Sequence, residues 1–207
     1  MRDRFTTAIG LCAVSLAFAS SAAFAFDNPL SADAIREAYF IATGSPGKRN
    51  DFFARYTHHP PAPKTGPAVS TIQIQTPFAA VVQDISDHSV NIHAPDAVQQ
   101  YYGKAAHFRV VVTVAFTATY PPSASSSMQL GDFWDKFHIH LRQAKQIAAL
   151  SVQGKPIMST QTRSGYIGAT IVANYNPDKI QSGPATVIVT GPDDARTEAS
   201  FDLSALR

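Results

Sequence analysis

Cysteine is almost missing from this chain, since Cys12 is the only one among 207 residues. It lies inside an apolar N-terminal run and follows Leu11, where a lipoprotein site needs a small residue. We therefore expect Cys12 to be lost with a cleaved N-terminal segment. The mature chain then has no disulfide, no thiolate nucleophile and no cysteine-ligated zinc. Such a protein depends on its hydrophobic core, and a chain of this length can bury roughly 70% of its unfolded surface.

Glutamate and net charge are also scarce. Glu37 and Glu198 are the only glutamates, and lysine plus arginine exceed aspartate plus glutamate by only 17 to 15. Loss of the N-terminal segment removes Arg2, Arg4 and Asp3, which leaves 15 basic and 14 acidic residues. A chain so close to neutral has no strong field for nucleic acid or anionic lipid, so we expect no nucleic-acid partner. Most polar positions hold Ser, Thr, Gln or Asn, which suits β-structure outside the cytoplasm.

Motifs of catalysis and cofactor binding are missing as well. The chain has no G-x-S-x-G elbow, no HExxH, no phosphate loop and no dinucleotide fingerprint. A glycosidase usually needs two carboxylates across a cleft, and here an aspartate such as Asp132 or Asp135 would have to serve. We therefore expect no cofactor, and we favour a protein without enzymatic activity.

The N-terminus has the organisation of an export signal. A short basic start, Met1-Arg2-Asp3-Arg4, precedes an apolar run over residues 8–19 and the small-x-small pattern Ala23-Phe24-Ala25. The alternative is a membrane anchor, but about 20 apolar residues are needed to span a bilayer and this run is shorter. We predict a signal peptide over residues 1–25, cleaved after Ala25. The mature protein would then have no membrane span and would reside in the periplasm or outside the cell.

The clearest structural signal is a long alternation over residues 108–120. The even positions are apolar, whereas the odd positions are rich in threonine and more polar. Because side chains alternate across a strand, this pattern predicts a strand with one apolar face. Pro121-Pro122 ends the strand by removing backbone donors. We take this stretch as the central strand of a sheet.

Helical spacing of apolar residues dominates the first half, and strand alternation dominates the second. The sequence predicts helices over residues 31–43, 48–56, 76–87 and 95–103, with an extended proline-rich linker over 58–67. It predicts further strands over 69–75, 89–93, 133–142, 166–175, 185–190 and 196–203. It also predicts a hairpin with arms over 147–152 and 156–162 around Gln153-Gly154-Lys155.

These elements indicate an α+β fold. We expect a mostly helical region over residues 26–104, packed on or preceding an antiparallel β-sandwich over residues 105–207. Strands separated by turn signals every 8 to 12 residues are typical of such a sandwich, and an immunoglobulin-like architecture is one form of it.

Three short segments carry a resemblance to a known group. In their order, these segments resemble a group of uncharacterised secreted bacterial proteins. They are Leu30 to Phe40, then Pro63-Lys64-Thr65-Gly66-Pro67, then Thr76-Pro77-Phe78. A looser similarity surrounds Gly165-Tyr166-Ile167-Gly168. The resemblance implies export and brings no activity with it.

His138 and His140 are the candidate metal ligands. On one strand face, residues i and i+2 place their Cβ atoms about 7 Å apart, and a third ligand from a neighbouring strand could complete a zinc or copper site. With an acid such as Asp135, that site would support a metal-assisted hydrolase. Alternatively, the two histidines are simply the exposed face of a strand whose other face is buried. Cationic residues on both sides of the pair favour this second interpretation, so we expect no bound metal.

Trp134 is the candidate contact surface. It falls opposite Phe133 in the alternation, and an exposed indole often marks a binding surface. A place in the core is the alternative. The hypothesis that best fits the sequence is a non-catalytic exported protein that binds a protein or glycan of the cell envelope, or associates with it structurally. The metal-assisted hydrolase is the rival hypothesis.

Overall fold

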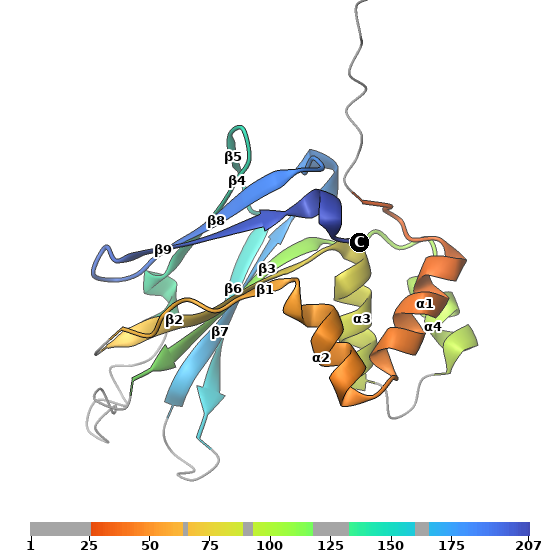
Figure 1. The fold of residues 1–207 in the computed structure, drawn as a ribbon, viewed down its shortest axis with the longest axis horizontal. Coiled ribbons are helices and arrows are strands. Elements are labelled where there is room, and N and C mark those ends of the chain that lie inside the picture. The colour runs from red at the N-terminus through yellow and green to blue at the C-terminus, as the bar shows by residue number, and fades with distance from the viewer. Residues whose placement is uncertain (1–25, 64–65, 89–92, 118–132, 160–165) are drawn as a thin grey trace, which may run out of the picture.

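A computed structural model describes residues 26–63, 66–88, 93–117, 133–159 and 166–207. In these residues the chain forms four α-helices and two antiparallel sheets, one of five strands and one of four, so the fold is mixed α+β. Figure 1 draws the sheets as two layers, with the helices gathered beside the five-stranded one. No helix in the described segments is long and apolar enough to cross a membrane.

Local sequence signals account for the two N-terminal helices. Helix α1 (Ala32–Ala42) begins after Ser31, whose hydroxyl accepts a hydrogen bond from the Ala34 amide at 3.2 Å. Helix α2 (Pro46–Ala54) begins in the same way after Ser45, with proline at its first position. The helices predicted over 31–43 and 48–56 are therefore confirmed, with the second shifted two residues toward the N-terminus.

Helices α3 (Pro77–His88) and α4 (Ala94–Tyr101) complete the helical layer. Thr76 caps α3, since its Oγ1 accepts from the Ala79 amide at 3.1 Å. Both were predicted from their apolar spacing. Helices α1, α3 and α4 bury a common cluster that includes Ile35, Val82 and Ile85. Because α3 also contacts β2 and β3, it connects this helical cluster to the sheet.

The five-stranded sheet has the order β1-β2-β3-β7-β6. Its strands, in that order, are β1 (Thr57–His58), β2 (Pro67–Gln75), β3 (Phe108–Phe116), β7 (Tyr166–Tyr175) and β6 (Ser151–Met158). Strand β3 is in the middle, which confirms the central strand predicted from its alternation; the end of that prediction, residues 118–120, lies outside the described residues. Since β1 and β2 belong to the N-terminal half, a boundary at Lys104 falls between two paired strands.

The four-stranded sheet has the order β5-β4-β8-β9. Its strands are β5 (Gln146–Ile147), β4 (His138–Arg142), β8 (Pro184–Thr190) and β9 (Arg196–Asp202). A tight turn joins β8 to β9, in which the Asp194 amide donates to the Gly191 carbonyl at 3.2 Å. One buried cluster draws side chains from both sheets, among them Val112 and Ile171 from the first and Leu141 and Val187 from the second.

Two predictions on either side of the Trp134–Gly154 contact were wrong in part. Residues Phe133–Lys136 form a 3-10 helix instead of the start of a strand, and β4 begins only at His138. The expected hairpin around Gly154 is a single continuous strand, β6. A Cβ added at Gly154 would lie 1.9 Å from Cδ1 of Trp134, so the glycine makes room for the indole against the strand. Glycine inside a strand often marks such a close approach.

The predicted strand over residues 89–93 falls almost entirely on residues 89–92, which lie outside the described residues. The far arm of the expected hairpin also extends past Ser159 into residues 160–162, which lie outside them too.

Candidate functional site

The outer face of the five-stranded sheet is the face turned away from the four-stranded sheet. Strand register places its side chains in rows, because directly paired residues share a face. The first row is Gln75, Arg109, Asn174 and Ser151, read from β2 through β3 and β7 to β6. The second row is Gln73, Val111, Val172 and Gln153, and the third is Thr71, Thr113, Thr170 and Lys155.

A hollow of about 650 Å³ opens over these rows. Its lining comes from strands β2, β3, β7 and β6 and from the C-terminal half of α3. The lining residues are Gln73, Gln75, Gln83, Asp84, Asp87, Arg109, Val111, Thr113, Gln153, Lys155, Thr170, Val172 and Asn174. We call this site the polar hollow. Its volume falls in the range of sites for small molecules and short chains.

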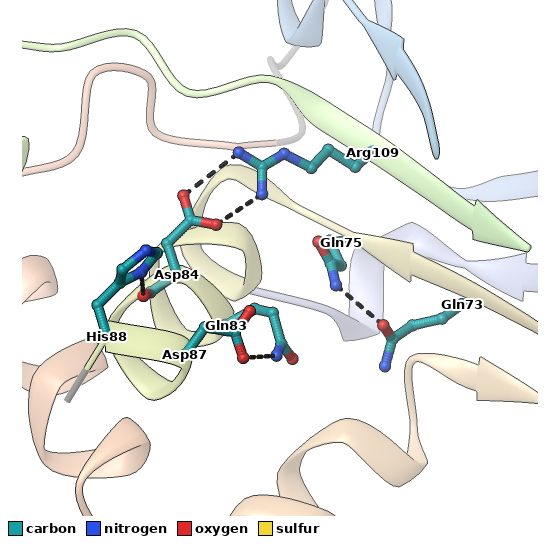
Figure 2. A network of polar contacts seen from close by, with 7 residues as sticks. All are labelled: Gln73, Gln75, Gln83, Asp84, Asp87, His88 and Arg109. Carbon is teal, nitrogen blue, oxygen red and sulfur yellow. Dashed lines mark hydrogen bonds and ion pairs between the residues drawn. The ribbon is translucent and has the colours of Figure 1, made fainter. Parts of the chain in front are cut away.

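Helix α3 forms one wall of the polar hollow, and an ion pair fixes it there. Arg109 donates through Nη1 to Asp84 Oδ1 at 2.8 Å and through Nη2 to Oδ2 at 3.3 Å. Figure 2 shows the two side chains facing each other between β3 and α3. Their side chains are only 27% and 32% exposed, so water screens this two-point contact less than it would a surface pair. The pair anchors the wall and cancels both charges.

Amide side chains on β2 form a connected chain at the base of the polar hollow. Gln75 Nε2 donates to Gln73 Oε1 at 2.9 Å, as Figure 2 shows. Gln73 Nε2 donates in turn to Thr57 Oγ1 at 3.2 Å. Gln75 is 4% exposed, one of two buried polar side chains in the described segments. At the other end of the first row, Asn174 Nδ2 donates to Ser151 Oγ at 2.9 Å. These bonds hold the amide groups in fixed orientations.

The end of α3 adds one carboxylate without a cationic partner. Asp87 Oδ1 accepts from Gln83 Nε2 at 2.8 Å, and Asp87 forms no ion pair within the described ranges. His88 lies beside it with Nδ1 2.7 Å from the Asp84 carbonyl oxygen, which requires the proton on Nδ1 for a hydrogen bond. Tyr101 is close to the Arg109–Asp84 pair. Burial of the phenol raises the pKa of Tyr101, the Asp84 carboxylate raises it further, and Arg109 lowers it.

The far side of the polar hollow is more open. Val111 and Val172 lie at the centre of the floor, half-buried, and Gln153 and Lys155 follow on the edge strand β6. Among the described residues, neither the Gln153 side chain nor the Lys155 ammonium has a hydrogen-bonding or ionic partner. These two groups are therefore available to a bound molecule.

The polar hollow offers many hydrogen-bonding groups to a molecule that enters it. Amides supply both donors and acceptors, threonine hydroxyls do the same, and only the centre of the floor, Val111 and Val172, is apolar. The lining contains neither a serine or cysteine nucleophile nor a histidine base. Nor does any group of three His, Cys, Asp or Glu side chains, in the part of the chain that is described, lie close enough together to hold a metal ion.

His138 and His140 lie elsewhere, on the outer face of the four-stranded sheet. His138 is exposed and His140 half-buried, and the two alternate with buried Ile139 as the pattern predicted. Their partners across the sheet are Thr190 and Ile188 of β8, and Gln146 Nε2 lies 3.1 Å from His140 Nδ1. The structure thus brings the pair together on one face, beside neighbours that are not metal ligands.

Trp134 is half-buried at the edge of the core. Its ring meets Phe133 edge-on, with centroids 5.4 Å apart, and it packs over Gly154 of β6. These contacts give the indole a structural role at this edge. A binding role for its remaining surface stays a prediction.

Sequence reasoning missed the residues of the polar hollow. The signal was present in the odd positions of the central strand, where Arg109 and Thr113 make a polar face on a strand whose other face is buried from Phe108 to Val114. What the sequence did not reveal is that α3 folds back over this face, since that depends on the long-range contact between Asp84 and Arg109.

No protein-family model, curated protein or solved structure matches the chain. The resemblance to secreted bacterial proteins therefore stays a prediction.

Proposed function

We propose that this protein is exported and acts without catalysis, by binding a protein or glycan of the cell envelope in the polar hollow. The observation that carries the proposal is the lining itself. Five amide side chains surround a small apolar floor, and the most buried charges, those of Arg109 and Asp84, already cancel each other. Pockets with fixed polar groups around an apolar floor are the usual form of a ligand site.

Export is the second part of the proposal. It rests on the N-terminal signal pattern and on a mature chain without cysteine or strong net charge. The first described residue after the proposed cleavage, Phe26, stacks on Phe108 with ring centroids 5.7 Å apart. The mature chain would thus begin at a residue that packs on the core.

The third part concerns architecture. We propose that the two sheets pack face to face as a β-sandwich, which is supported by the buried cluster to which both contribute. An immunoglobulin-like strand arrangement stays a prediction. In this arrangement the outer face of the five-stranded sheet is free to form the polar hollow, because the core lies on its other side.

Binding can be tested by titrating the exported chain with penta-alanine and with maltopentaose, and following the side-chain amide signals of Gln73, Gln153 and Asn174 by NMR. We expect one probe to shift these signals in a saturable way. Thr170→Glu should abolish the shifts, because Thr170 is half-buried in the third row and the new carboxylate would sit beside Lys155.

Thr186→Glu is the matched control. Thr186 is also a half-buried threonine on an inner strand, and its partner across the sheet, Arg142, is also cationic. It belongs to the four-stranded sheet, so the variant should bind like the parent. If neither probe shifts the three amide signals, the proposed binding function is wrong.

A further inference from the structure

We propose that the polar hollow takes a short extended peptide with free ends, its amino group at Asp87 and its carboxylate at Lys155. This inference rests on the proposed function and names the class of ligand. It follows from charge placement, span, backbone complementarity and the nature of the floor.

Opposite charges lie at opposite ends of the polar hollow. Asp87 is on α3, one turn after Asp84, whose partner Arg109 belongs to the first row. Lys155 is in the third row on the far edge strand. Since Arg109 and Asp84 neutralise each other, Asp87 and Lys155 are the charges left for a ligand. A molecule with a cation at one end and an anion at the other complements them.

The span across the hollow, from Arg109 in the first row to Lys155 in the third, suits about five residues. From Arg109 to the third row is four residues along β3, or about 13 Å, and from β3 to β6 is two strand spacings, or about 10 Å. The diagonal is therefore roughly 16 Å. An extended chain covers about 3.3–3.6 Å per residue, so five residues span roughly 17 Å.

The amide groups repeat with the period of an extended peptide. Gln73 and Gln75 are two residues apart on β2 and project from the same face. Their spacing of about 6.8 Å equals the two-residue repeat of a strand. A peptide that crosses the sheet diagonally therefore meets these amides near one end of the hollow, and Gln153 offers a further amide near its other end.

The floor favours a peptide over a glycan. Val111 and Val172 provide branched aliphatic surface that suits small apolar side chains, and the hollow's lining includes no aromatic ring. Sugar rings commonly stack their C–H faces on aromatic side chains. A peptide with small side chains therefore fits the described lining better.

The test compares penta-alanine with its N-acetylated and C-amidated forms in the NMR titration. We expect each cap to weaken binding about two- to fivefold, as is typical for an exposed charge pair. Asp87→Asn should weaken the binding of penta-alanine with free ends by a similar factor. In that variant, N-acetylation of the peptide should have no further effect on binding. Lys155→Gln should likewise weaken the binding of the free peptide, and C-amidation should then have no further effect.

Matched controls are Asp178→Asn and Lys179→Gln, exposed neighbours on the 3-10 helix Pro177–Lys179, which is not part of the lining. In both control variants, acetylation and amidation of the peptide should weaken binding as much as they do in the parent.

The outcomes separate the two proposals. If penta-alanine binds but neither cap matters, or if maltopentaose alone shifts the amide signals, the peptide-end assignment is overturned while the binding function stands. If neither probe shifts them, the polar hollow is not a site for either ligand class and both proposals fall.

Discussion

The outer faces of the two sheets differ in what covers them, although both come from strands with the same alternating pattern. On the five-stranded sheet, α3 stands over the face and its ion pair with Arg109 is 27% and 32% exposed. On the four-stranded sheet, the comparable pair, Arg196 with Glu198, joins residues of one strand and is 52% and 46% exposed. In this protein the polar strand face is hollowed into a site where helix α3 stands beside it.

The largest effect is expected from disturbing the pairing of β3 with β7 in the five-stranded sheet. A Cβ at Gly168 would lie 2.1 Å from the backbone oxygen of Val114, on the neighbouring strand β3. Because backbone cannot rotate away as a side chain can, Gly168→Ala should lower the free energy of unfolding by about 3 kcal/mol or more. Urea denaturation followed by circular dichroism measures this.

Gly154→Ala is the informative control for that prediction. Its new Cβ would meet the Trp134 ring at 1.9 Å, but an indole at the edge of the core can turn aside. We expect a loss of about 1–3 kcal/mol together with a change in tryptophan fluorescence. A Gly168→Ala variant as stable as the parent would show that β3 and β7 can separate without cost.

The second prediction compares the two ion pairs directly. Arg109→Met keeps most of the side-chain volume but leaves Asp84 without its partner in a half-buried place. We expect a loss of about 1–2 kcal/mol, since breaking a partly desolvated pair exposes the remaining charge to an unfavourable environment. The same change at Arg196 should cost less than about 0.5 kcal/mol, because its pair is exposed. Equal losses in the two variants would remove the distinction between the faces.

The third prediction concerns the core beneath both faces, where two buried tyrosines differ. Tyr56 Oη donates to the Arg207 carbonyl at 3.1 Å and accepts from the Arg207 amide at 3.2 Å. Tyr175 Oη has no partner among the described residues. Tyr56→Phe should therefore cost about 1–2 kcal/mol at pH 7, whereas Tyr175→Phe should be neutral or stabilising by up to about 1 kcal/mol.

Alkaline pH extends this test. Burial raises the pKa of Tyr175 to about 12, above the ordinary value of 10.0. Between these values the unfolded chain has released the proton and the folded chain has kept it, so stability falls as pH rises, by about 1.4 kcal/mol per pH unit at most. Burial raises the pKa of Tyr56 in the same direction. Tyr175→Phe should thus flatten the decline between pH 10 and 12 without abolishing it, and parallel curves would contradict the prediction.

The sequence predicted most elements because their signals are local. Ser31, Ser45 and Thr76 each precede a helix with the chemistry of a cap, and all three caps form. The pattern of β3 gave both its position and its buried face. The errors around Gly154 and Phe133 arose where a contact between segments 20 residues apart decides the local structure. A glycine in a turn and a glycine under an indole look alike in a sequence.

The candidate site was less predictable than the fold for the same reason. The histidine pair is visible in the sequence because its two members are two residues apart on one strand. The polar hollow joins four strands and a helix. Each row of its floor takes one residue from each strand, so no two residues of a row are neighbours in the sequence. Its members are common residue types, chiefly glutamine and threonine. They form a site only because the strand register brings them together on one face.

The smallest effect is expected on the open face of the four-stranded sheet. His138 is exposed and His140 half-buried, and their partners across the sheet are Thr190 and Ile188. If these histidines are only a solvated strand face, replacing both by alanine should change the free energy of unfolding by less than about 0.5–1 kcal/mol, chiefly through the Gln146 contact at His140. Elemental analysis of the parent and of the double variant checks the rival hypothesis in the same preparation. Stoichiometric zinc or copper that is lost in the double variant would make this face a metal site, and the open face would then be the active one. Unchanged metal content and stability in the two proteins would leave the polar hollow as the face where function is to be sought.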